Sequence, residues 1–445
     1  MKRGPGTLLS AGLLILGLSG LTGCAADGTA RQAAAADSAL QRMAVELLPA
    51  VERASGIESR EPVRLASSDR PRLEAFLTEQ LERDLPPDRA EAVVASYARF
   101  GLLDPDLDLL ELLRSLYLEQ VAGYYDPAAD TLFVRDDLDS EQLRPVLVHE
   151  MVHALQDQVM DLDSTMAARR DDNDALAAAQ AAVEGHATYV MMEWQLGQTT
   201  GRQVDLTSLP DLGGMLAGVD LGGAAGMPVL ADAPPLIRES LLFPYVGGLS
   251  FVQRLWRDAG AREPPLGADL PASTEQVLHP DRFVDDRDAP RALDYDEGLP
   301  AGWTEVHQDG LGEFEVRHFL QTFLADSSRA GSAARGWDAD RYRLLREESG
   351  EREVLVWVSA WDDADEADAF ADAAVDAFRA RYGDDARVTG PGAGSAADAP
   401  EASRGVDVVR EERDGVALVR VVDRPVTLDA DRMPEFVEYA VIGAP

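Results

Sequence analysis

The stretch Val148-His149-Glu150-Met151-Val152-His153-Ala154-Leu155 decides how the rest of this 445-residue chain is interpreted. It is an H-E-x-x-H pattern inside an apolar run that favours a helix. Because residues four apart share one face of a helix, His149 and His153 can hold one metal ion together. Glu150 would then lie beside the ion, where a carboxylate can take a proton from water. The stretch therefore predicts a zinc site with hydrolytic chemistry.

A catalytic zinc ion needs three protein ligands and one open position. Metzincin spacing would require glycine and histidine next, but Gln156 and Val159 stand there, so that class is excluded. The better third ligand is Glu184, within Ala181-Ala182-Val183-Glu184-Gly185-His186-Ala187. This segment belongs to a second predicted helix, residues 175–196, which can return antiparallel to the first. Its small residues Gly185 and Ala187 would allow a close approach of the two helices.

This arrangement resembles the gluzincins, over roughly residues 121–193. The resemblance implies a zincin-like domain in which Zn²⁺ is bound by His149, His153 and Glu184. It also implies that Glu150 is the general base that activates water and passes a proton to the leaving amine. In these families an edge strand before the motif helix binds extended peptide by strand addition. The strand that best matches it is predicted at residues 131–135.

The chain also resembles a narrower group, bacterial lipoprotein metallopeptidases of poorly defined substrate. The shared segments span most of the chain and are Gly123–Pro127, His149–Gln158, Glu184–Ala187, Phe243–Tyr245 with Gly248, and Ser273–Pro280. One departure is His186, where the resemblance leads us to expect an acidic residue. A carboxylate usually orients a ligand histidine, so the group that does so here stays open.

The group that stabilises the oxyanion is also open, with Tyr245, His186 and His279 as candidates for this catalytic role. Asp157, four residues after His153, is either a partner of that histidine or part of a solvated helix face. His279 and Glu275 are more often residues that fix a loop or cap a helix than metal ligands.

The pattern of the N-terminal residues predicts a signal peptide that is removed by processing, and not a part of the core. A short basic start is followed by an apolar run, residues 8–18, and then by Leu21-Thr22-Gly23-Cys24, which resembles the lipobox of bacterial lipoproteins. Cleavage before Cys24 and lipidation of this residue are expected, and the alternative is an ordinary signal peptide. Cys24 is the only cysteine, which excludes an intramolecular disulfide. We expect a lipid-anchored protein of the bacterial cell envelope, with the outer membrane favoured, facing the periplasm or the exterior.

The charge is strongly acidic, with 80 Asp and Glu against 41 Lys and Arg. Such a surface repels nucleic acid, so a nucleic-acid partner is not expected. The expected partners are a protein or peptide substrate and, through the lipid anchor, the membrane.

The predicted fold class is α+β. Residues 1–23 form the signal peptide, 24–37 a tether, 38–300 a mainly helical zincin-like domain with a small sheet, and 310–445 a smaller α+β domain with an antiparallel sheet. Helices are predicted over 38–54, 69–84, 87–100, 106–119, 140–161, 175–196, 235–259, 313–324 and 364–382, with interruptions at Pro244 and Gly247-Gly248. Strands are predicted at 341–346, 354–361 and 416–422, and residues 285–309 are expected to be a polar boundary. Residues 197–233 are expected to form a long loop, which would be an inhibitory lid if it covers the site.

Three functions follow from these observations. The first is a lipid-anchored zinc metallopeptidase that hydrolyses peptide bonds at the cell envelope. The second is a non-catalytic binding lipoprotein that keeps the fold as a scaffold, although an intact Glu150 argues against this. The third is a zinc amidase acting on a non-protein amide, such as the peptide stems of the cell wall. An exposed edge strand would favour peptide, and a closed pocket would favour a small amide.

Overall fold

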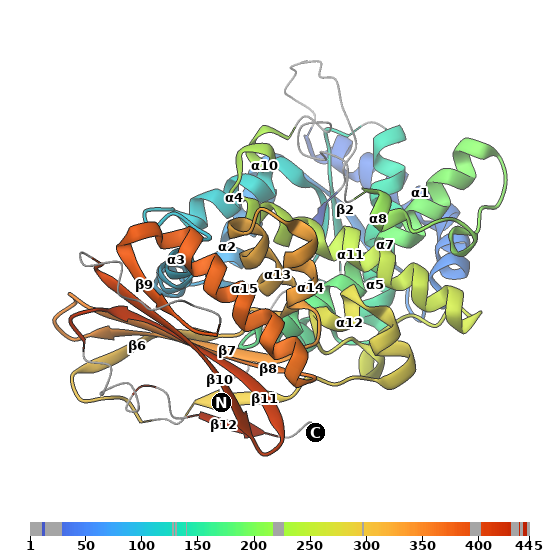
Figure 1. Cartoon of the computed structure of the whole chain (residues 1–445). Helices are drawn as coiled ribbons and strands as arrows, with labels where there is room; N and C mark the ends of the chain where they lie inside the picture. Colours follow the sequence, from blue (N-terminus) through green and yellow to red (C-terminus); the bar gives the residue numbers. More distant parts are fainter. Residues whose placement is uncertain are drawn as a thin grey trace. The chain divides into compact units, whose positions relative to one another are not determined.

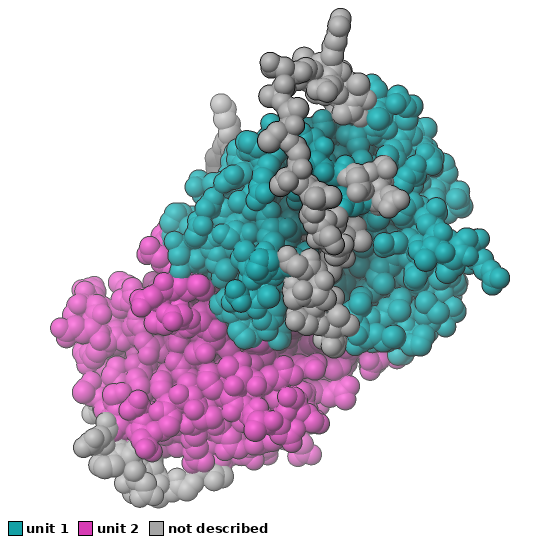
Figure 2. All heavy atoms as spheres, turned by 90° about the horizontal axis from the view of Figure 1, so that it is seen from above, with its two compact units in different colours: residues 1–87, 108–170, 176–271 teal, residues 88–107, 171–175, 272–445 magenta. Residues whose placement is uncertain are grey.

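The computed structural model describes residues 11–13, 29–126, 129, 131–138, 140–216, 227–295, 298–391, 402–428, 436 and 439–442. The chain divides into two compact units, coloured separately in Figure 2: unit 1 comprises residues 1–87, 108–170 and 176–271, and unit 2 comprises residues 88–107, 171–175 and 272–445. Helices and sheets occur in both, which confirms the predicted α+β class. Cys24, the predicted lipidation site, lies outside the described residues.

Unit 1 consists mainly of helices and contains one small sheet (Figure 1). Its helices are α1 (Thr29–Ser55), α2 (Arg70–Asp84), α4 (Leu109–Gln120), α5 (Ser140–Val159), α6 (Leu162–Ala167), α7 (Asn173–Thr200, whose first residues are counted in unit 2), α8 (Leu212–Leu216), α10 (Pro228–Asp232) and α11 (Pro235–Ala259), with short 3-10 turns η1 (Leu206–Ser208) and η2 (Gly267–Asp269). Among the helices of the described residues, none is both long enough and apolar enough to cross a bilayer.

Several helix ends follow from local sequence. The side chain of Asp69 accepts a hydrogen bond from the backbone N–H of Arg72 and caps α2, and Asp108 caps α4 in the same way through the N–H of Glu111. Helix α11 ends at Gly260, whose φ of 61° is the left-handed conformation that glycine adopts without strain. These helix ends lie within a few residues of those predicted for 69–84, 106–119 and 235–259.

Two helix predictions need correction. Helix α1 begins at Thr29 rather than Ser38, so part of the predicted tether is helical backbone. The reason is the run Ala33-Ala34-Ala35-Ala36, since alanine has the highest helix propensity. Helix α11 continues without a break through Pro244 and the two glycines after it. Burial of its later residues, including Leu249 and Trp256, stabilises the helix despite these weak helix formers.

The sheet of unit 1 has the strand order β1-β3-β4-β2, from β1 (Ala11–Leu13), β2 (Leu65–Ser68), β3 (Val121–Asp126) and β4 (Thr131–Arg135). Strands β3 and β4 form the predicted antiparallel hairpin, although Pro127, Ala128 and Asp130 of its turn lie outside the described residues. The prediction that residues 131–135 are an edge strand is wrong. Strand β4 pairs with β3 on one side and, in parallel, with β2 on the other.

The segment 197–233 is not one long loop. Helix α7 extends to Thr200, and η1, α8 and α10 follow within the segment. Residues 217–226 lie outside the described part, so the predicted lid remains a prediction.

Unit 2 contains helices on a larger sheet (Figure 1). Its helices are α3 (Pro87–Phe100), α12 (Thr274–Leu278), η3 (Arg282–Asp286, a π-helical turn), α13 (Gly312–Phe323), α14 (Ser327–Ala334), α15 (Ala364–Tyr382) and the 3-10 turn η4 (Gly383–Asp385). Its strands are β5 (Ala292–Tyr295), β6 (Trp303–Asp309), β7 (Trp337–Glu347), β8 (Glu353–Trp361), β9 (Ala386–Thr389), β10 (Arg404–Arg413), β11 (Val416–Pro425) and β12 (Tyr439–Ile442).

Six of these strands form one sheet in the order β6-β7-β8-β11-β10-β9. All its pairs are antiparallel except β9 with β10, which confirms the predicted sheet apart from that parallel edge. Helices α13 and α15 cover one face, and the β5–β12 pair packs on the other (Figure 1). Strands β5 and β6 lie inside the expected boundary 285–309, so the polar residues there alternate with buried ones such as Leu293 and Trp303.

A buried carboxylate fixes the centre of unit 2. Asp340 accepts hydrogen bonds from the indole N–H groups of Trp337 and Trp357 and from the backbone N–H groups of Leu311 and Gly312. Burial raises the pKa of Asp340, and these four donors oppose that rise. Since a buried carboxylate is costly without partners, this fully bonded group favours one arrangement of α13 on β7.

Candidate metal centre

The two histidines of the motif lie on α5, which is buried on nearly all sides. Leu147, Val148, Met151, Val152 and Leu155 have no exposed surface. A helix of this kind can hold polar side chains only where they meet polar partners. His149 and His153 point from α5 to Glu184 on α7, as predicted for the third ligand.

The three ligand atoms form a nearly equilateral triangle. Glu184 Oε2 lies 3.1 Å from His149 Nε2 and 3.4 Å from His153 Nε2, and the two histidine nitrogens are 3.1 Å apart. Ligand atoms about 2.0–2.1 Å from a tetrahedral zinc ion are about 3.3 Å from one another. His149, His153 and Glu184 therefore form a potential metal-binding triad whose donor types and spacing fit a single ion of this kind.

Charge and burial at the triad act in opposite directions. Burial alone would raise the pKa of Glu184, but the neighbouring His153 and His149 lower it to about 2, so this carboxylate is ionised. Burial raises the pKa of Glu150 to about 8. Both carboxylate oxygens of Glu150 are buried without a hydrogen-bond partner among the described residues. Glu150 therefore lies where a group that takes a proton from a substrate or from water would be expected.

The second ring nitrogen of His153 has a partner that the sequence did not indicate. His153 Nδ1 lies 2.8 Å from Gln156 Oε1, and Gln156 Nε2 lies 3.0 Å both from the carbonyl oxygen of Val183 and from His186 Nδ1. His186 Nε2 in turn lies 3.0 Å from the carbonyl oxygen of Ser55 at the end of α1. In the sequence, Gln156 stands at a spacing that excludes a metzincin and belongs to a shared segment, but neither fact indicates this contact. Its position three residues after His153, on the same helix face, was the signal that could have identified it.

The predicted catalytic candidates have different positions. The ring of Tyr245 on α11 stacks near that of His149, with centroids 6.2 Å apart and an angle of 28° between the planes. Both ring nitrogens of His186 are engaged by Gln156 and Ser55, and burial lowers its pKa to about 3. This arrangement argues against the predicted oxyanion-stabilising role for His186. His279 belongs to unit 2, where its Nε2 lies 2.8 Å from Glu313 Oε1.

Asp157 is a structural residue. One carboxylate oxygen accepts a hydrogen bond from the Tyr125 hydroxyl at 3.0 Å, and the other accepts one from the backbone N–H of Leu162 at 3.0 Å. It therefore fastens the end of α5 to β3 and to the start of α6, and the amide of Gln156 contacts His153 instead.

Close contact between α7 and α11 determines where Glu184 and Tyr245 lie. A Cβ atom added to Gly185 would be 2.1 Å from the carbonyl carbon of Gly248, and one added to Gly248 would be 2.0 Å from the carbonyl oxygen of Ala181. The small residue at 185 was expected to admit the motif helix, but the helix that approaches it is α11. This crossing places Tyr245, three residues before Gly248, on the side of His149.

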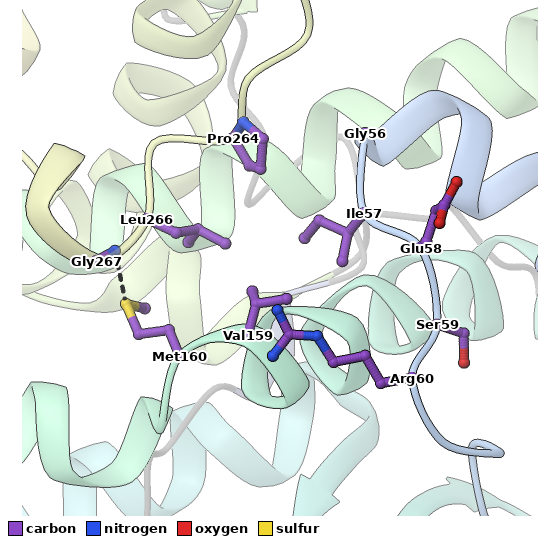
Figure 3. Close-up of a pocket in the computed structure, with 10 residues that line it drawn as sticks. All are labelled: Gly56, Ile57, Glu58, Ser59, Arg60, Val159, Met160, Pro264, Leu266 and Gly267. Atoms are coloured by element: carbon purple, nitrogen blue, oxygen red, sulfur yellow. Dashed lines mark hydrogen bonds between the residues drawn. The ribbon is translucent and has the colours of Figure 1, made fainter.

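Unit 1 also has a surface hollow of about 510 Å³ (Figure 3). Ile57, Val159 and Leu266 point toward one another in it, and the backbone N–H of Gly267 donates to Met160 Sδ at 3.0 Å. None of the triad residues lines this hollow, so it is a feature of the surface beyond the end of α5.

A second group of three carboxylates lies in unit 2 and comprises Glu275, Asp288 and Asp362. The guanidinium of Arg282 contacts it: Nη1 hydrogen-bonds to Asp288 at 2.6 Å and to Asp362, and lies 3.8 Å from Glu275. Because this arginine supplies the positive charge, the group is accounted for as an ion-pair network.

Comparison with known proteins adds one match. Residues 299–433 match the model of a domain of unknown function, DUF8575. This segment lies in unit 2 and contains none of the triad residues. No curated protein and no solved structure matched the chain.

Proposed function

We propose that this protein is a zinc-dependent metallopeptidase of the gluzincin kind. The observation that supports the proposal is the triad of His149, His153 and Glu184, with ligand atoms 3.1–3.4 Å apart and Glu150 next to His149 in the chain. Two nitrogen donors and one ionised carboxylate are a ligand set used by catalytic zinc. A scaffold without activity would have no use for a buried, unbonded Glu150.

Each residue has a role in the proposed reaction. When bound, zinc would polarise the scissile carbonyl and lower the pKa of a water molecule. Glu150 takes the proton of the attacking water and passes it to the leaving amine, and no hydrogen-bond partner among the described residues holds its carboxyl oxygens. Tyr245, whose ring on α11 stacks near that of His149, donates a hydrogen bond to the oxyanion.

The test is the variant Glu150→Gln in the soluble chain that begins at Ala25. We expect it to bind about one zinc ion per chain, as the parent does, and to lose peptide cleavage, because an amide cannot accept the proton. Glu82→Gln, which changes an exposed carboxylate on α2, is the matched control and should keep both properties. Cleavage by Glu150→Gln at the parental rate would show that the proposed mechanism is wrong.

The strand that receives a peptide substrate is proposed to be β3. Strand β4 is paired on both sides, but β3 has β1 as its outer neighbour, in an antiparallel pair. Strand β1 consists of residues 11–13, which the predicted cleavage before Cys24 would remove. Strand β3 would then be an edge that can bind extended peptide through its backbone. Protein that retains residues 1–23 should therefore cleave peptides more slowly than protein that begins at Ala25.

The site of action is proposed to be the bacterial cell envelope, with lipid on Cys24 as the anchor. The support is the lipobox-like Leu21-Thr22-Gly23-Cys24 in a chain without another cysteine. Expression of the full chain with radiolabelled palmitate in a bacterial host tests this. Label in the parent and none in Cys24→Ser is expected, and equal labelling of both would refute the anchor.

One observation favours a second substrate class. The side chains of His149, His153 and Glu184 are only 2%, 0% and 7% exposed, so the triad lies in a closed environment. A closed site suits a small amide better than a protein chain. Cleavage of short cell-wall stem peptides, together with no cleavage of unfolded proteins, would support this amidase over the peptidase.

A further inference from the structure

We propose that Gln156 is the residue that positions His153 for metal binding, and that it is itself oriented by Val183, His186 and Ser55. The proposal rests on the proposed zinc site and gives a role to a residue that lies in a shared segment but to which neither the motif nor the resemblance assigns one. Four hydrogen bonds, three at the Gln156 amide and one from His186 to Ser55, support it.

The direction of the first two bonds is fixed by a backbone carbonyl. The oxygen of Val183 can only accept, so the group of Gln156 that faces it at 3.0 Å must be the amide nitrogen. The amide oxygen must then face His153 Nδ1, at 2.8 Å. Because an amide oxygen also only accepts, His153 carries its hydrogen on Nδ1. When the ring is neutral, as a metal ligand must be, the lone pair is then on Nε2, the nitrogen that faces Glu184 and His149.

The remaining bonds fix the amide from its other side. The second N–H of Gln156 points to His186 Nδ1, at 3.0 Å. His186 must accept there and therefore carries its own hydrogen on Nε2, which donates to the carbonyl oxygen of Ser55 at 3.0 Å. The carbonyl oxygens of Val183 and Ser55 therefore fix the orientation of the Gln156 amide and the tautomer of His186.

Burial and packing make this row of hydrogen bonds rigid. Gln156, His153, His186 and Ser55 have no exposed surface, so each unmade bond would leave a buried polar group without a partner. The ring of Trp256 packs edge-on against His186, with centroids 5.4 Å apart and an angle of 80°. His149 differs, since its Nδ1 has no hydrogen-bond partner within the described part of the chain. Gln156 therefore orients one of the two histidine ligands.

The choice of an amide has a chemical consequence. A metal-ligating histidine usually donates its other ring N–H to a carboxylate, a carbonyl or water. A carboxylate at position 156 would place an oxygen against the carbonyl oxygen of Val183 and would lose both donors. Glutamine supplies the acceptor for His153 without adding negative charge. His186 completes this arrangement as the acceptor for the second amide N–H, which explains why a histidine stands where an acidic residue was expected.

The first experiment measures zinc affinity of the soluble chain by competition with a chromogenic chelator. Gln156→Ala should weaken zinc binding by about 10- to 100-fold, the range found when such outer partners are removed. The control is Gln158→Ala on the same helix, whose amide bonds to the backbone of Arg60 and Glu61; it should bind zinc as the parent does.

The variant His186→Ala should weaken zinc binding less than Gln156→Ala, because Gln156 keeps its bond to Val183. Since His186 acts only through Gln156, the double variant should be no weaker than Gln156→Ala.

A second measurement, the NMR spectrum of the histidine rings in the parent protein, separates positioning of His153 from general destabilisation and needs no variant. The chain has six histidines, so selective ¹⁵N labelling of histidine gives a spectrum that can be assigned. In the zinc-loaded parent, His153 should show Nδ1–H with Nε2 bound to metal, and His186 should show Nε2–H without metal. The opposite tautomer at either ring would overturn the proposal. So would a Gln156→Ala variant that binds zinc as tightly as the parent and gives the same visible spectrum with Co²⁺. A parent that binds no zinc would refute the proposed function itself.

Discussion

The crossing of α7 and α11 leads to a prediction that opposes helix propensity. In the interior of a helix, glycine is less favourable than alanine by about 1 kcal/mol, so Gly185→Ala on α7 should stabilise the chain if propensity decides. The structure predicts the reverse. The new methyl group would lie 2.1 Å from the carbonyl carbon, 2.3 Å from the oxygen and 2.5 Å from the Cα of Gly248.

The size of the effect follows from these distances. Carbon atoms in contact are about 3.5–4.0 Å apart, so the two helix backbones must separate by more than about 1 Å. Both backbones are buried among residues such as Ala181 and Leu249, which are fully buried and cannot yield independently. Overpacking of this kind costs about 1–3 kcal/mol, and we place the loss at the upper end after subtracting the propensity gain. Unit 1 has the size for which 1 kcal/mol lowers Tm by about 2–4 °C.

Differential scanning calorimetry of the soluble chain tests this. Gly185→Ala should lower the midpoint of one transition by about 6–12 °C and should also weaken zinc binding, because Glu184 is its neighbour. Gly197→Ala on the same helix is the matched control. Its Cβ would meet only the carbonyl oxygen of Arg202, at 3.4 Å, so the midpoint should stay or rise. If Gly185→Ala unfolds at or above the parental temperature, the close approach of the two backbones is wrong.

Three further predictions concern single side chains. Glu184→Ala should remove nearly all bound zinc by elemental analysis at neutral pH, and retention of one zinc ion per chain would refute the triad. Tyr245→Phe should keep zinc but lower kcat by about 10²- to 10³-fold, as expected for loss of an oxyanion donor; an unchanged kcat would assign that role elsewhere. Glu315, buried beside Tyr97, has its pKa raised by burial to about 8, above the usual 4.5. The folded protein therefore holds this proton after the unfolded chain has lost it, so stability falls between about pH 4.5 and 8, by at most about 1.4 kcal/mol per pH unit. Glu315→Gln should reduce this slope in urea titrations at pH 5 and 8, and equal slopes would contradict the assignment.

Much of the fold could be predicted from local pattern. The helix at 364–382 and the strand at 354–361 agree with α15 and β8, since the first has apolar residues at helical spacing and the second is a continuous apolar run. Prediction failed where long-range packing decides. The sequence predicts β4 as an edge strand because nothing in residues 65–68 indicates a parallel partner. Helix α11 continues through Gly247-Gly248 because α7 lies against it, which its own sequence does not indicate.

The candidate site shows the same limit. The spacing of His149 and His153 alone places both on one helix face. The next predicted helix contains few acidic residues, so Glu184 could be predicted as the third ligand. The sequence leaves the partner of His153 open, with Asp157 as one candidate and a solvated helix face as the alternative for that residue. The structure instead places Gln156 there, because the carbonyl oxygen of Val183 requires a donor in front of it. Tertiary packing sets the direction in which a carbonyl group points. The spacing of residues along the sequence does not predict that direction.

The bond from His186 to Ser55 also bears on the order of folding. It joins positions 131 residues apart, whereas Gln156 and His186 are 30 apart. Contacts of such high sequence separation form late, because the entropy of closing a long loop is lost before they contribute. The row of hydrogen bonds behind His153 is thus complete only when the first helix has joined its last members. Metal loading is therefore expected near the end of folding, and shortening of α1 would weaken it without removing a single ligand.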